Sequence, residues 1–177
     1  MSDEKLIRAI HERDEAAISR IIEAHSRLLW RVAQAVLNDL GSAQDVEECV
    51  ADTFIYLWRF PEKYDPERGS LKTWLSIVAR TKALDRCREL SRRAALPLEE
   101  AAFVRMPDLP EDGLLRSDAR QALQAAIEKL DEPDREILLR RYYHNQKPRQ
   151  IALALGIPVK QVENRLYRTK QKLRNTL

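Results

Sequence analysis

The chain has 177 residues, of which 33% are charged and 44% hydrophobic, and its formal net charge is +3. This length suits one large domain or two small ones, and the composition excludes a wholly disordered chain. No apolar run approaches the roughly 18–20 residues that a membrane span needs. The N-terminus lacks a signal-peptide pattern, so a cytoplasmic protein without membrane insertion is expected.

Hydrophobic periodicity predicts helices from the start of the chain. Apolar residues spaced three, four and seven apart predict a first helix across residues 6–22 and a second across 28–37. Gly41 marks the end of the second helix. A third helix is predicted to begin near Ser42 and to stop before Pro61.

A loop and another long helix are predicted next. Residues 63–70 contain the turn-forming pair Asp65 and Pro66. Ser70 suits the N-cap of a fourth helix that continues to about Arg93, because its hydroxyl can accept a backbone N–H.

The pattern then breaks, which divides the chain in two. Residues 94–113 are acidic, contain three prolines and show no helical period, so we predict a flexible linker. We therefore predict an all-α fold of two small helical domains, 1–93 and 114–177, the second containing a helix-turn-helix. The helices of the second domain are expected near 114–130, 132–143, 148–155 and 158–175.

The charge of each segment is more informative than the total. Residues 1–67 carry a net −6 and residues 94–113 a net −4, whereas residues 68–93 carry +6 and residues 114–177 carry +7. Residues 140–177 alone contain ten basic residues and one acidic residue. Two separate basic segments on predicted helices favour nucleic-acid binding over an ordinary solvated surface.

The pattern of residues 148–166 is typical of a helix-turn-helix. A short helix leads to a turn at Gly156, and Pro158 opens a second helix, which in such motifs enters the major groove. Val162 and Leu166 share the face expected to be buried. The opposite face presents groups that can contact base edges and phosphates, namely Lys160, Asn164, Tyr167, Arg168 and Gln171.

The fourth helix is also basic. It carries more cations than a core can accept, and such a helix suits contacts with single-stranded nucleic acid. For Trp74 itself, a place in the core is favoured. The cations are Lys72, Arg80, Lys82, Arg86, Arg88, Arg92 and Arg93.

No motif of an enzyme, a metal site or a cofactor site is found. The sequence has no GxGxxG, P-loop, HExxH or GxSxG pattern. Cys49 and Cys87 stand apart from any Cys or His cluster, so two buried thiols are expected.

The residues described so far resemble the extracytoplasmic function (ECF) sigma factors, small bacterial members of the sigma-70 family. Residues 45–59 resemble the core-binding helix of region two. Residues 64–75 and 77–80 resemble its promoter-melting and minus-10 segment. Residues 130–137, the Arg141-Tyr142-Tyr143 run and the helix-turn-helix resemble region four. Gln150 stands where the family frequently has Glu, which favours a local capping role.

The resemblance implies a bacterial transcription initiation factor that is not an enzyme and needs no cofactor. Its implied partners are the β′ and β subunits of core RNA polymerase, promoter DNA and an anti-sigma factor. Core binding falls on Asp45, Glu48, Asp52, Phe54 and Trp58. Minus-10 recognition and melting fall on Lys63, Tyr64, Arg68, Lys72, Trp74, Arg80, Thr81 and Arg86. Minus-35 recognition falls on Arg149, Lys160, Asn164, Tyr167 and Arg168.

Two other interpretations stay open at this point. A stand-alone helix-turn-helix regulator would bind specific DNA without polymerase, as a dimer on half-sites about one helical turn apart. An enzyme acting on nucleic acid could hold a metal through Asp45, Glu48 and Asp52, whose spacings place them on one helix face. Exposed helix carboxylates more often form a solvated or partner-binding face.

Overall fold

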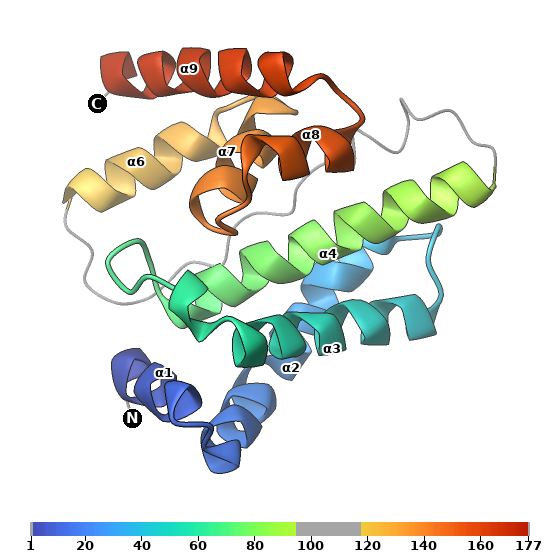
Figure 1. Ribbon diagram of the computed structural model, residues 1–177, viewed down its shortest axis with the longest axis vertical. Helices are drawn as coiled ribbons and strands as arrows, with labels where there is room; N and C mark the ends of the chain where they lie inside the picture. The colour runs from blue at the N-terminus through green and yellow to red at the C-terminus, as the bar shows by residue number, and fades with distance from the viewer. Residues whose placement is uncertain (1, 95–117, 177) are drawn as a thin grey trace. The chain divides into compact units, whose positions relative to one another are not determined.

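The computed structural model describes residues 2–94 and 118–176 (Figure 1). The secondary structure of this part of the chain is helical, without a strand, which confirms the all-α prediction. The chain divides into two compact units, Met1–Asp112 and Gly113–Leu177. The predicted linker, 94–113, lies outside the described residues apart from Ala94, and the predicted domain limits stay a prediction.

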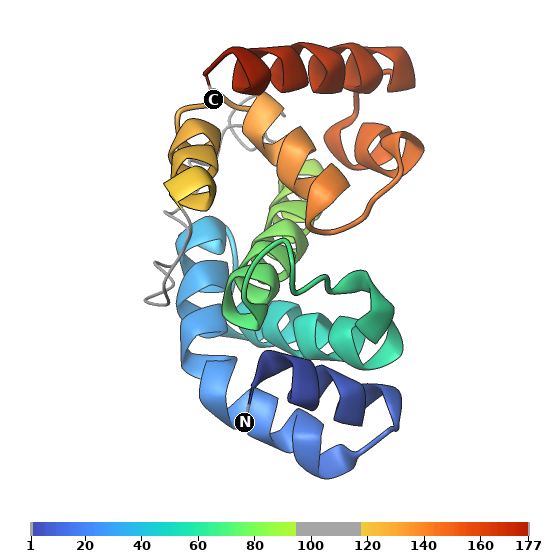
Figure 2. The same cartoon turned by 90° about the vertical axis from the view of Figure 1, so that its left-hand side faces the viewer.

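The first unit is built on three long helices. Helices α2, α3 and α4 pack against one another, and α1 folds back along the first half of α2 (Figure 2). Leu29, Leu57 and Leu75 are buried at their centre. The elements are α1 (Asp3–His11), α2 (Glu15–Leu37), α3 (Ala43–Arg59), the short 3-10 helix η1 (Pro61–Lys63) and α4 (Leu71–Arg93).

The predicted boundary between the first two helices was wrong. The break expected between residues 22 and 28 does not exist, because α2 runs without interruption through that polar stretch. The chain turns instead at residues 12–14, where Arg13 adopts a positive φ of 62°. The side chain of Asp14 accepts the Ala16 N–H at 2.8 Å and caps α2. The apolar period continues across this turn, which is why periodicity alone did not show it.

The predicted start of the third helix near Ser42 and the predicted cap of the fourth helix at Ser70 are both confirmed. Ser42 Oγ accepts the N–H of Asp45 at 3.2 Å, and the Asp45 carboxylate accepts the N–H of Ser42 at 2.7 Å. Ser70 Oγ accepts the N–H of Thr73 at 3.1 Å. Both bonds satisfy backbone donors that a helix start leaves without an intrahelical acceptor.

The two thiols are buried, as expected from the sequence. Cys87 Sγ donates to the carbonyl oxygen of Val36 at 3.3 Å. Burial raises the pKa of the Cys49 thiol to about 12 and that of the Cys87 thiol to about 11. Both groups are therefore protonated and unreactive near neutral pH.

The second unit is a small bundle around the helix-turn-helix. Helices α6, α7 and α8 each contact α9, and α7 also contacts α8. The core consists of Ile137, Ile151, Val162 and Leu166 with apolar neighbours. The elements are α6 (Asp118–Glu128), α7 (Asp134–Tyr142), α8 (Pro148–Leu155) and α9 (Val159–Thr176).

Candidate nucleic-acid and partner interfaces

Asp45, predicted to contact a partner, joins two helices of the first unit. Its Oδ1 accepts the Nε–H of Arg86 from α4 at 2.7 Å, while its Oδ2 accepts bonds from Ser42. These Ser42 bonds, together with the bond from Arg86, lower the pKa of Asp45 to about 2. Arg86, predicted to contact DNA, also donates to Glu89 at 2.8 Å. The two side chains therefore connect α3 to α4, a role that the sequence did not reveal.

The outer face of α3 carries the other predicted partner contacts. Glu48 and Asp52 are exposed, whereas Phe54 is buried in the core and Trp58 is half-buried. Ile55 is 47% exposed and was missed by the sequence reasoning. At about 100° per residue it lies on the same face as Glu48 and Asp52, opposite the buried stripe, so helical projection could have found it. Together Glu48, Asp52 and Ile55 form an exposed strip along α3, in which two carboxylates are followed by one apolar side chain.

A loop with one short helical turn separates α3 from α4 and carries predicted minus-10 residues. Tyr64 is buried, and its hydroxyl donates to the carbonyl of Gly69 at 3.0 Å, which closes the loop on itself. Arg68 is exposed and forms an ion pair with Asp65 at 3.1 Å. Lys63, at the end of η1, is half-exposed. The loop thus presents cations on a support of buried aromatic side chains.

Most of the predicted DNA contacts on α4 lie inside the structure. Trp74 is 3% exposed, and its ring stacks on Tyr56 with centroids 6.0 Å apart, as the core interpretation favoured. Arg80 and Thr81 are also buried, and the Thr81 hydroxyl donates to the Ile77 carbonyl at 2.9 Å. Lys72 and Lys82 are partly exposed cations of α4. Lys82 was not predicted as a site residue, and its Nζ lies 5.3 Å from the centroid of the Tyr56 ring.

The turn between α8 and α9 has the geometry that the sequence predicted. Gly156 takes the left-handed conformation, with φ 66° and ψ 31°, and ends α8. The N–H of Ile157 donates to the carbonyl of Ala152 at 3.1 Å. Gln150 Oε1 accepts the N–H of Lys147 at 2.8 Å, so its predicted capping role is confirmed.

The predicted minus-35 residues lie on the surface of the second unit, four of them on one face of α9 and Arg149 in the first turn of α8. All are exposed, and Tyr167 is 65% exposed. A shallow depression runs along the first half of α9 and is lined by Lys160, Asn164 and Arg168 among others. Arg165, which also lines the depression, pairs with Asp134 of α7 at 2.8 Å and fixes the rotation of α9. The exposed set is Arg149, Lys160, Asn164, Tyr167 and Arg168.

Two findings bear on the alternative interpretations. Within residues 2–94 and 118–176, no group of three or more His, Cys, Asp or Glu side chains is placed to hold a metal ion. Asp45, the first of the three carboxylates considered for such a site, is engaged by Ser42 and Arg86 instead.

None of the helices in the part of the chain that the structure describes is long and apolar enough to cross a membrane.

Comparison with known families accounts for both units. Residues 21–93 match the family described as sigma-70 region 2, and residues 120–173 match sigma-70 region 4. The chain belongs to the sigma-70 family. The order of the two matched regions and the names of the relatives place it among the ECF sigma factors. It is therefore an RNA polymerase sigma factor, which binds core polymerase and directs initiation at specific promoters. This confirms the predicted family and function and disfavours a stand-alone regulator.

Similar sigma factors align along most of the chain. The ECF RNA polymerase sigma factor SigL of Mycobacterium tuberculosis is 29% identical over 164 residues, covering 92% of this chain and 90% of SigL. RpoE of Cereibacter sphaeroides is 26% identical over 174 residues, covering 96% and 91% of the two chains. Among solved structures, CnrH in complex with the cytosolic domain of CnrY is 25% identical, with a TM-score of 0.41 and coverage of 98% and 95%. RpoE of Bartonella quintana, solved with the anti-sigma factor NepR, is 18% identical, with a TM-score of 0.38 and coverage of 89% and 94%.

Proposed function

We propose that the two units of this sigma factor divide promoter recognition between them. Residues 1–93 bind core polymerase and act on the minus-10 element, and residues 114–177 read the minus-35 element. The exposed polar face of α9 carries this proposal, since Lys160, Asn164 and Arg168 present the groups that pair with base edges and phosphates.

Core polymerase is proposed to bind the outer face of α3. Glu48 and Asp52 supply negative charge beside the exposed apolar side chain of Ile55, a composition that suits a basic partner surface. In this proposal Phe54 supports the face from below, because it is buried. Asp45 acts through its bond to Arg86 rather than by direct contact.

The loop between α3 and α4 is proposed to hold the minus-10 strand. Lys63, Arg68 and Lys72 are the cations near the loop that can meet phosphates. The buried rings of Tyr64 and Trp74 support the loop instead of stacking on bases. We call residues 60–70 the minus-10 loop.

The remaining expectations follow from the family resemblance. The protein is proposed to act in the cytoplasm, without catalytic activity or a cofactor of its own. An anti-sigma factor is proposed to cover the polymerase-binding faces of both units and so keep the protein from polymerase. A purified anti-sigma protein from the same organism should then compete with core polymerase for this chain.

A transcription experiment tests the proposed division. Matched core polymerase is mixed with the protein and a promoter library, and run-off transcripts identify the promoter. Arg168→Glu should lower transcription from minus-35-dependent promoters by about tenfold or more while core affinity stays within twofold of the wild type. Unchanged promoter activity would exclude Arg168 from the minus-35 interface.

A second pair of variants tests core binding. Asp52→Lys should weaken core binding about tenfold, because it reverses the charge on the acidic outer face of α3. Glu47→Lys is the matched control, since Glu47 is also exposed on α3 but lies about 140° from Asp52 around the helix. Equal core affinity for both variants and the wild type would show that polymerase binds elsewhere.

A further inference from the structure

The first helix lies ahead of the part of the chain that matches sigma-70 region 2, which begins at residue 21. Helix α1 nevertheless packs on α2 and on η1, inside the minus-10 loop. Ile7 and Ile10 are buried in the same core as Tyr64 and Trp74. The segment of residues 2–14, which contains α1 and the turn after it, therefore contacts the proposed DNA-binding loop directly.

One hydrogen bond ties this segment to the start of α4. Asp3 Oδ2 accepts the N–H of Leu71 at 2.9 Å, across 68 residues of sequence. Leu71 is the first residue of α4, so its N–H has no acceptor within the helix. A carboxylate also suits the positive end of the helix dipole. Asp3 therefore fixes the point where the minus-10 loop ends.

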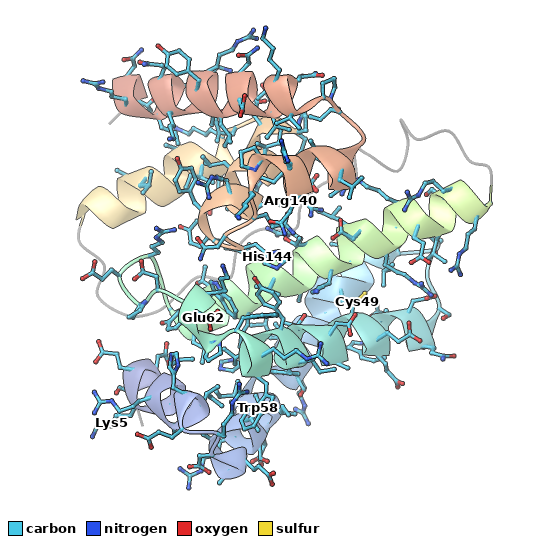
Figure 3. The ribbon with its side chains drawn as sticks, in the orientation of Figure 1. Lys5, Cys49, Trp58, Glu62, Arg140 and His144 are labelled. Atoms are coloured by element: carbon cyan, nitrogen blue, oxygen red, sulfur yellow. The ribbon has the colours of Figure 1, made fainter. Side chains whose placement is uncertain are left out.

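A second hydrogen bond ties the same segment to the end of α3. Arg13 Nη1 donates to the carbonyl of Trp58 at 2.6 Å, and the Arg13 guanidinium lies 5.4 Å from the Trp58 ring centroid. Figure 3 shows the Trp58 side chain directed from α3 toward α1 and α2. The last carbonyls of a helix lack intrahelical donors, and a cation suits the negative end of its dipole. Arg13 therefore fixes the point where the minus-10 loop begins.

The two bonds hold both ends of one loop from one short segment. We propose that residues 2–14 form a brace that sets the shape of the minus-10 loop, with Asp3 and Arg13 as positioning residues for promoter opening. The positive φ of Arg13 fits this role, because such a conformation in a non-glycine residue persists only where its surroundings impose it. The functional part of this inference rests on the proposed role of the loop.

A binding experiment tests the effect on DNA. Holoenzyme is assembled from core polymerase and the full chain carrying Asp3→Ala or Arg13→Ala. The matched controls are Glu4→Ala and Arg8→Ala, which remove exposed charges from the same segment, residues 2–14. We expect the Kd for a single-stranded minus-10 oligonucleotide to rise about threefold to tenfold for the brace variants, and less than twofold for the controls. Core affinity should not change. Brace variants that behave like the controls would overturn the proposal.

Two further measurements separate a failure of the brace from a failure of the loop assignment. Lys63→Ala and Arg68→Ala test the loop itself: if these variants bind the oligonucleotide normally, the proposed function of the loop is wrong. Hydrogen exchange of the full chain without DNA tests the brace alone. Asp3→Ala should speed exchange about tenfold across residues 60–73 and leave the centre of α2 unchanged. An equal rise throughout α2, α3 and α4 would show that α1 only stabilises the whole unit, and would overturn the brace.

Discussion

Replacing Gly156 with Ala should weaken the second unit by about 1 kcal/mol. Gly156 has φ 66°, a conformation that L side chains rarely adopt, and a Cβ built there meets no atom within 4 Å. The added methyl group therefore overlaps no other atom, and the lost free energy of unfolding comes from the backbone conformation alone. Holding a non-glycine residue in the left-handed region costs about 1–2 kcal/mol. Gly156→Asn should cost less than Gly156→Ala, because Asn tolerates this conformation.

The two units can be followed separately in the intact protein. All three tryptophans, Trp30, Trp58 and Trp74, belong to the first unit, so their fluorescence reports its unfolding alone. Hydrogen exchange of peptides from α8 and α9 reports the second unit. Gly156→Ala should speed exchange of those peptides about fivefold, the factor that 1 kcal/mol gives, while the tryptophan transition stays at the wild-type denaturant concentration.

Two outcomes would refute this reasoning. An Ala variant as stable as the wild type would show that the turn does not need the left-handed conformation. An Asn variant less stable than the Ala variant would show that contacts of the side chain, and not the backbone conformation, decide the cost.

Two more predictions concern the first unit. The Asp45 carboxyl has a pKa of about 2 in the folded protein, below its ordinary value of 3.8, so its stabilising effect is complete above about pH 4 and is lost as the pH falls toward 2. Denaturation followed by tryptophan fluorescence should show this loss of stability in the wild type. Stability should depend less on pH over the same range in Asp45→Asn. Identical pH profiles would show that the bonds of Asp45 to Arg86 and Ser42 do not cause the loss of stability at low pH. Cys49 and Cys87, whose pKa values are raised by burial, should resist alkylation by iodoacetamide at pH 8 in the native protein and react after denaturation. Rapid native labelling, measured by mass spectrometry, would contradict their burial.

The helix-turn-helix was predictable because the information for it is local. Each signal acts within a few residues of its own position. Gly156 ends α8, Pro158 precedes the start of α9, and Gln150 accepts a backbone bond at the start of α8. The same holds for Ser42 and Ser70, whose hydroxyls cap the helices that begin beside them. The exposed face of α9 followed from helical projection.

The roles of single residues in the first unit were harder to predict. Periodicity places Asp45 and Arg86 each on a helix face, but it cannot show that these two faces meet. The family resemblance assigned one to polymerase and the other to DNA, and these two roles stay predictions; the structure adds that the two side chains join at 2.7 Å. It also divided the first two helices at the wrong point, since α1 and α2 share one apolar period across the turn at Arg13.

The sequence by itself determined the helical class, the helix starts and the helix-turn-helix, because each depends on spacings within one element or one motif. The family followed from the resemblance of several such motifs, in order along the chain, to those of the sigma-70 proteins. The tertiary structure alone decided which charged residues pair across elements. Asp45 with Arg86, Asp3 with Leu71 and Arg13 with Trp58 are 41, 68 and 45 residues apart. No local pattern encodes such pairs, since they depend on how the helices pack around the shared apolar core.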